Sequence, residues 1–218
     1  MPSIRTKRLP DGRYLCSQCE SKCLSIEEAE LLFNEVKQKL EKILGKQTEC
    51  PVKLHIVNKS EMEAVRKAKR RGTGAAGLLC SNLVLIKSRK TGERKIIPKD
   101  CAIYVLSDMP RGNFINTVAH ELGHHWQKHE YPLLDPNRMK VEGFAEYCAC
   151  LINTAYGQPE YNREEAREGK GLVYKEGLRL YRRLAAQNGL SGALNYMKQN
   201  TVSREDFVKK LKKVQADR

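Results

Sequence analysis

A short motif in the chain combines residue types that can bind and use a metal ion. His120, Glu121 and His124 stand in the segment HELGH. Residues four apart on a helix lie on one face, so the two imidazoles can converge on one ion while Glu121 projects to one side. Zinc binds neutral imidazole nitrogens and keeps one position for water in catalytic sites. The motif therefore predicts a zinc site in which Glu121 takes a proton from the metal-bound water.

This chemistry requires that the motif lies on a helix and that this helix packs against another element of the fold. The segment NFINTVAHELGHHWQKH, residues 113–129, carries apolar residues at helical spacing among its polar ones. It follows CAIYVL, residues 101–106, whose β-branched and aromatic residues are typical of a strand. We therefore expect the metal motif on an amphipathic helix that packs against a sheet.

The third metal ligand has three candidates. His125 points about 100° away from His124 around a helix and is expected at the surface or behind a ligand. His129 lies five positions after His124, without the glycine turn and sixth-position histidine of metzincins. Glu142 lies eighteen positions after His124, beyond the loop YPLLDPNR, whose two prolines favour a helix break and return.

These comparisons favour Glu142, which with the two histidines makes the ligand set of gluzincins. Glu142 begins the predicted helical stretch VEGFAEYCACLI. Glu146 lies one turn further on the same face. Its carboxylate either accepts the second N–H of a ligand histidine or faces solvent as an ordinary surface group.

Patterns elsewhere predict an α+β fold. Residues 25–45 open with a capping box, Ser25 with Glu28, and end at Gly45, so we expect a helix there. From residue 113 onward the pattern is helical. We therefore expect the fold of a zincin-like metallopeptidase, in which a small N-terminal mixed sheet precedes a helical half that carries HExxH. Strands are predicted at 52–57, 82–87, 94–97 and 101–106, with a turn between the second and third, and a short helix at 60–68.

Composition indicates one main domain with a small appendage. The 218 residues are 40% hydrophobic and 30% charged, without a long apolar run, so we expect a soluble protein that does not enter a membrane. The first residues lack the apolar stretch of a secretory signal, and the expected location is the cytoplasm. The net charge of +14 is concentrated at 66–74 and 209–218. These runs suit an acidic partner or nucleic acid, or are a solvated surface without stacking aromatics.

Eight cysteines without an export signal are expected to be reduced thiols or metal ligands. Cys16, Cys19 and Cys23 form a CxxC pair plus one. They either bind a structural zinc, with Cys50 or a histidine as fourth ligand, or are free thiols in a decayed finger. The remaining four are expected to be small buried apolar residues: Cys80, Cys101, Cys148 and Cys150.

Several segments in a fixed order resemble the DA-one-like zinc peptidases, the plant LIM-domain peptidases that restrict organ growth and their prokaryotic relatives. LPDGRYLCSQC resembles the tail of that family's LIM-type finger, and RRGTGAAG resembles its Gly-Thr-Gly segment. HELGH and VEGFAEY stand at its metal motif and following helix, and YKEGLR at a downstream Tyr-x-x-Gly-x-Arg segment. The resemblance implies a zinc endopeptidase with His120, His124 and Glu142 as ligands and Glu121 as base, acting on a protein or peptide.

The resemblance also divides the chain into a finger-like remnant, residues 1–24, and a peptidase domain, residues 25–218. The plant enzymes are activated by ubiquitin, but no ubiquitin-interacting helix or complete LIM finger precedes the peptidase part. That activation is therefore not carried over. Tyr174, in YKEGLR, is a candidate donor to the oxyanion of the reaction, or an aromatic packed in a helix. The strand at 101–106 is a candidate edge for an extended substrate, or an ordinary core strand.

Two other functions compete with this prediction. A basic nucleic-acid-binding module would carry the motif as a structural or incidental feature. A SprT-like protease acting on DNA-bound proteins would also be basic and carry HExxH. That family takes its third ligand from a histidine well downstream, and this chain has no histidine after His129.

Overall fold

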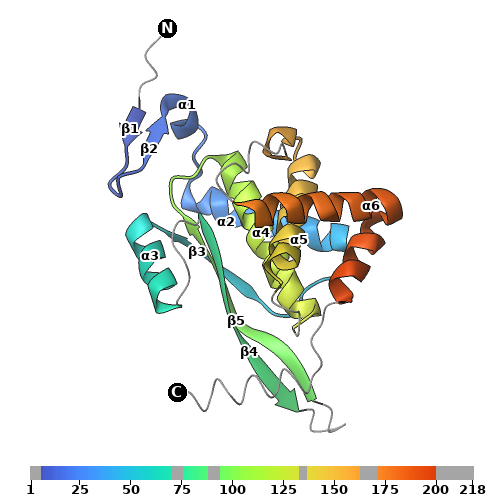
Figure 1. Cartoon of the computed structure of the whole chain (residues 1–218). Coiled ribbons are helices and arrows are strands. Elements are labelled where there is room, and N and C mark those ends of the chain that lie inside the picture. The colour runs from blue at the N-terminus through green and yellow to red at the C-terminus, as the bar shows by residue number, and fades with distance from the viewer. Residues whose placement is uncertain (1–5, 70–75, 88–93, 133–136, 163–170, 200–218) are drawn as a thin grey trace.

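The structure is a computed structural model that describes residues 6–69, 76–87, 94–132, 137–162 and 171–199 (Figure 1). Its main body joins a three-stranded sheet to a group of helices, so the predicted α+β class is confirmed. Within the described residues, no helix is both long and apolar enough to cross a membrane.

The sheet consists of β3 (Val52–Val57), β4 (Gly77–Lys87) and β5 (Arg94–Leu106). β5 is the middle strand, parallel to β3 and antiparallel to β4. The strands predicted at 94–97 and 101–106 are parts of this single strand. Asp100, with φ of 53°, marks the irregular place between them, because a short polar side chain tolerates the left-handed conformation. The predicted turn after residue 87 falls largely outside the described residues.

The helix predicted from residue 25 is α2 (Ile26–Leu44), and its ends are those expected from the sequence. Ser25 Oγ accepts a hydrogen bond from the amide of Glu28, and the Glu28 carboxylate accepts one from the amide of Ser25. Gly45 ends the helix at φ of 73°, a conformation that glycine adopts without steric cost. The short helix α3 (Lys59–Ala68) is capped in the same way by Asn58 and Glu61.

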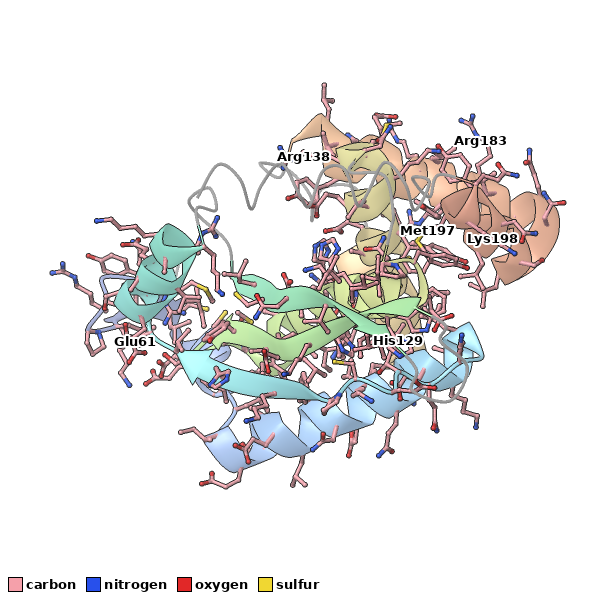
Figure 2. The ribbon with its side chains drawn as sticks, turned by 90° about the horizontal axis from the view of Figure 1, so that it is seen from below. Glu61, His129, Arg138, Arg183, Met197 and Lys198 are labelled. Atoms are coloured by element: carbon pink, nitrogen blue, oxygen red, sulfur yellow. The ribbon has the colours of Figure 1, made fainter. Side chains whose placement is uncertain are left out.

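The helical half consists of α4 (Arg111–Glu130), α5 (Arg138–Ala155), a 3₁₀ turn η1 (Pro159–Asn162) and α6 (Leu172–Lys198). α4 packs against β4 and β5 on one side and against α2 and α5 on others, and α6 covers α5 (Figures 1 and 2). The motif helix therefore lies at the centre of the body. Its core includes Ile103 and Val105 of β5, Ile115 and Val118 of α4, and Phe144, Ile152, Leu178 and Tyr181.

Glycines bring the three last helices unusually close together. A Cβ at Gly123 of α4 would lie 3.1 Å from Ala145 Cα and 3.1 Å from Cys148 Cβ, both on α5. A Cβ at Gly143 would lie 2.6 Å from the backbone of Gly177 on α6. A side chain at Gly143 would force α5 and α6 apart, and one at Gly123 would press on α5, so the glycine of HELGH favours the close approach of α5 to the metal motif.

The first described residues form a small unit of their own secondary structure. β1 (Thr6–Arg8) pairs antiparallel with β2 (Tyr14–Cys16), and the four-residue helix α1 (Ser17–Glu20) follows. Arg13 Nη1 donates a hydrogen bond to Ser107 O over 2.9 Å, which ties the hairpin to the chain just before α4. The division of the chain at residue 24 stays a prediction.

Candidate metal centre

α4 presents His120 and His124 side by side, one turn apart. Their Nε2 atoms lie 3.1 Å from each other, and the ring planes meet at 87°. Two imidazole nitrogens this close need a proton or a metal cation between them, because two lone pairs would otherwise face each other. The helix thus directs two potential ligand atoms at one point.

α5 brings Glu142 to the same point. Its Oε2 atom lies 3.4 Å from His120 Nε2 and 3.3 Å from His124 Nε2. Ligand atoms about 2.0–2.1 Å from a tetrahedral zinc lie about 3.3–3.4 Å from one another. The distances in this group are close to that spacing, and the three residues form a group able to hold a metal ion. The structure therefore brings together the three residues predicted as ligands.

Polar groups behind the histidines fix their orientation. Glu146, buried on α5, places Oε1 3.1 Å from His120 Nδ1. Gln127, buried on α4, places Oε1 2.9 Å from His124 Nδ1 and donates from Nε2 to Val141 O over 2.9 Å. Glu146 was predicted in this role from the sequence, but Gln127 was not. Its position three residues after His124, on the same helix face, is the signal that would have identified it.

We expect Gln127→Ala to weaken zinc binding by about 10–100-fold, because the ring of His124 loses the acceptor that fixes it. Zinc affinity is measured by competition with a chromophoric chelator. Gln187→Ala, which removes an exposed glutamine on α6, is the control and should bind zinc as the wild type does. Equal affinity in both variants would show that Gln127 plays no part in the site.

The charges of this group favour a bound cation. Burial opposes a charge on His120, but Glu142 and Glu146, with Glu121, outweigh it and raise the pKa of His120 to about 9. Burial likewise works to raise the pKa of Glu142, yet its contacts with His120 and His124 hold that pKa far below its usual range. Carboxylates therefore surround the two imidazoles, and a divalent cation would neutralise charge that a proton otherwise balances.

Glu121 lies beside the group and contacts the sheet. Its Oε2 accepts a hydrogen bond from the amide of Leu79 over 2.8 Å, and the side chain is 8% exposed. Gly77 gives it room, since a Cβ there would lie 3.1 Å from Glu121 Oε1. This hydrogen bond to one oxygen fixes the orientation of the Glu121 carboxylate between α4 and β4.

Tyr174 lies at the start of α6, close to the same histidines. Its ring centroid is 6.2 Å from that of His120, and the side chain is half-buried. Burial raises the pKa of Tyr174, and the negative charge of Glu142 adds to this, so the hydroxyl stays protonated at neutral pH. A protonated hydroxyl can donate a hydrogen bond, which the predicted role requires.

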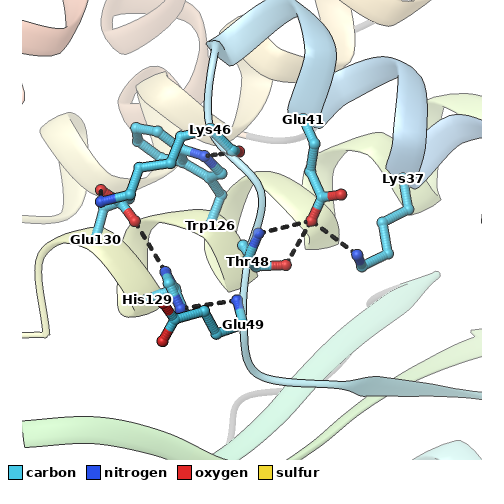
Figure 3. Close-up of polar contacts among 8 residues, drawn as sticks. All are labelled: Lys37, Glu41, Lys46, Thr48, Glu49, Trp126, His129 and Glu130. Atoms are coloured by element: carbon cyan, nitrogen blue, oxygen red, sulfur yellow. Dashed lines mark hydrogen bonds and ion pairs between the residues drawn. The ribbon is translucent and has the colours of Figure 1, made fainter.

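The other two histidines of the motif region do not belong to this group. His129 Nε2 accepts a hydrogen bond from the amide of Glu49 over 3.0 Å, and His129 Nδ1 lies 2.9 Å from Glu130 Oε1 (Figure 3). Figure 2 places His129 well apart from Arg138, the first residue of the helix that carries Glu142. His125 was predicted at the surface or behind a ligand, and the surface position is wrong, because its side chain is 1% exposed. It is buried because α4 is covered on more than one face.

The strand suggested as an edge for substrate is the middle of the sheet. β5 pairs with β3 on one side and with β4 on the other, so residues 101–106 have no free edge to offer. The sequence could not show this, because the position of a strand in a sheet is decided by its neighbours and not by its own residues. Among the described strands of this sheet, β3 and β4 are the outer ones.

The cysteines match the prediction only in part, and for the N-terminal three the structure has the free thiols that were one of the two alternatives. Cys16, Cys19 and Cys23 do not form a group that could hold a metal ion within the described residues. Cys50, suggested as their fourth ligand, lies instead beside Cys101, with their Sγ atoms 3.3 Å apart. Cys101 and Cys148 are buried as expected, whereas Cys80 and Cys150 are half-buried.

Comparison with known proteins gives no relative for this chain: no protein-family model, curated protein or solved structure matches it. Of the two basic runs, residues 209–218 and residues 70–74 of the run 66–74 lie outside the described residues. What the described residues establish is a mixed α and β body with two histidines and a glutamate that are able to hold a metal ion.

Proposed function

We propose that the protein is a zinc-dependent metalloendopeptidase of the gluzincin type, a DA-one-like peptidase with a zincin-like fold. The single observation that carries this proposal is the convergence of His120 Nε2, His124 Nε2 and Glu142 Oε2, whose separations are 3.1–3.4 Å. Two imidazoles and one carboxylate, with a further position open, are the ligands of zinc in thermolysin-like catalytic sites.

Zinc is the metal that these donors suit best. Imidazole nitrogens favour zinc, copper, iron or nickel over magnesium and calcium, and a mixed set of two histidines and a carboxylate is common for catalytic zinc. When bound, zinc supplies a Lewis acid that polarises a carbonyl and lowers the pKa of water toward neutrality. The remaining steps belong to the protein's own side chains.

Glu121 is the proposed general base. Its Oε2 accepts from the amide of Leu79, and its Oε1 has no hydrogen-bond partner among the described residues, so Oε1 is the proposed acceptor of a proton from the attacking water. The same carboxylate then donates that proton to the leaving amine. Tyr174 is the proposed donor to the oxyanion that develops on the substrate carbonyl, because its ring centroid lies 6.2 Å from that of His120 and its hydroxyl stays protonated.

The outer edge of β4 is the proposed binding surface for an extended substrate. The amide of Leu79 donates to Glu121, so it points away from β5 and toward the side of β4 that no other described strand covers. Backbone groups of alternate residues in an antiparallel strand share a direction, so Gly77 faces the same side. A peptide that adds to this edge would therefore run beside the catalytic glutamate. This replaces the sequence-based suggestion of residues 101–106.

Removal and return of the metal test this proposal. We expect the purified chain to cleave a denatured protein substrate. A chelator should abolish this activity, and Zn²⁺ should restore it whereas Mg²⁺ should not. Fragments are followed by mass spectrometry. Cleavage that persists after chelation, at a measured zinc content near zero, would exclude a zinc peptidase.

A further inference from the structure

A second group of potential metal ligands lies on another face of α4. It combines Cys50, in the segment between α2 and β3, with Cys101 of β5 and His125 of α4. One ligand atom from each lies within 4.8 Å of the others, and the two sulfur atoms are 3.3 Å apart. Three elements that are distant in sequence thus bring two thiols and an imidazole to one place.

His125 contributes a buried nitrogen atom that lacks a hydrogen-bond partner among the described residues. Its side chain is 1% exposed, and within the described residues its Nε2 atom has no hydrogen-bond partner. A buried polar nitrogen without a partner is destabilising, so such atoms are rare unless something binds them. Successive residues on a helix point about 100° apart, which is why His124 faces α5 while His125 faces the sheet and the Cys50 segment.

We infer that Cys50, Cys101 and His125 form a second metal site for a thiophilic ion of the zinc class. Thiolate and imidazole together select zinc among the abundant divalent ions, and hard ions such as magnesium are excluded. Thiolates on a tetrahedral zinc, with Zn–S of about 2.3 Å, lie about 3.7–3.8 Å apart. The observed 3.3 Å requires only a small adjustment.

A disulfide is the competing use of the two cysteines, and the geometry argues against it. Bond formation would bring the sulfur atoms from 3.3 Å to about 2.05 Å. It would also leave His125 Nε2 as it is, buried and without a partner. A metal ion satisfies all three residues at once. Since Cys50 is half-buried, water can reach the fourth position.

The ion would cross-link α4 to the segment that follows α2. That segment already contacts α4 and α2: Trp126 Nε1 donates to Lys46 O, Glu49 N donates to His129, and Thr48 N donates to Glu41 (Figure 3). Cys50 continues this row of contacts. Since His125 adjoins the ligand His124, the second ion would hold the catalytic helix in place against the sheet.

Cobalt binding to the full-length, metal-free chain tests the inference. Thiolates bound to Co²⁺ give an intense near-ultraviolet charge-transfer band, and the group of His120, His124 and Glu142 contains no thiolate. We expect the band in wild type and in His120→Ala/His124→Ala, and its loss in Cys50→Ser. Cys80→Ser is the matched control for a half-buried cysteine, and Cys16→Ser/Cys19→Ser tests the N-terminal thiols; both should keep the band.

Thiol protection provides a second readout that needs no variant. Alkylation of the reduced wild-type chain, followed by peptide mapping, should label Cys50 in the metal-free form and spare it when Zn²⁺ is present. Three outcomes would each overturn the inference. They are labelling of Cys50 that Zn²⁺ does not change, a cobalt band that survives Cys50→Ser, and a Cys50–Cys101 disulfide in protein that retains its zinc. Neither experiment depends on peptidase activity, so both stand apart from the proposed function.

Discussion

Glu121→Gln is expected to keep zinc and fold but to lose peptide-bond hydrolysis by about 10²-fold or more, the usual weight of general acid–base catalysis. The amide of glutamine has nearly the shape of the carboxylate, and its oxygen can still accept the hydrogen bond from Leu79. It cannot take up a proton from water at neutral pH. The variant therefore separates metal binding from metal use.

The measurement compares wild type and Glu121→Gln at equal zinc content. Both are incubated with a denatured protein substrate and by themselves, and fragments are followed by mass spectrometry. Glu130→Gln is the matched control on the same helix, because Glu130 contacts Lys46 and His129 rather than the metal group. We expect it to cleave as wild type does. Equal rates for wild type and Glu121→Gln would refute the role of Glu121 as base.

The parts of the site that could be predicted are those set by local sequence. Helical periodicity places His120 and His124 on one face, and the two prolines before Glu142 indicate a chain reversal. The structure has both features, and Glu142 Oε2 lies within 3.4 Å of both rings. Capping residues gave the ends of α2 for the same reason, since a capping box acts over three residues.

The parts that could not be predicted depend on contacts between distant residues. Whether a strand is central or outer is decided by its neighbours, so the pattern of residues 101–106 could not show that β5 lies between β3 and β4. His125 was expected at the surface or behind a ligand because it points about 100° away from His124, but α4 is covered on several faces and the side chain is buried. The approach of Cys50 to Cys101 follows only from the position of the α2–β3 segment.

Glu142 distinguishes the proposed ligand set from its alternatives, and its replacement should have a large effect on zinc. Glu142→Ala removes one of three protein ligands and leaves two imidazoles whose Nε2 atoms are 3.1 Å apart. Loss of a residue that only supports a ligand weakens metal binding by about 10–100-fold. We therefore expect Glu142→Ala to weaken zinc binding at this site by more than about 100-fold.

His129→Ala is the matched comparison, because the sequence alone left His129 as a competing third ligand. In the structure both of its ring nitrogens are engaged elsewhere, with the amide of Glu49 and with Glu130. His129→Ala should therefore bind zinc as tightly as wild type. Both variants are made in a Cys50→Ser background, so that chelator competition reports only on the group of His120 and His124. Weak binding by His129→Ala together with wild-type affinity in Glu142→Ala would move the protein out of the gluzincin class, since the carboxylate at α5 would then not be a ligand.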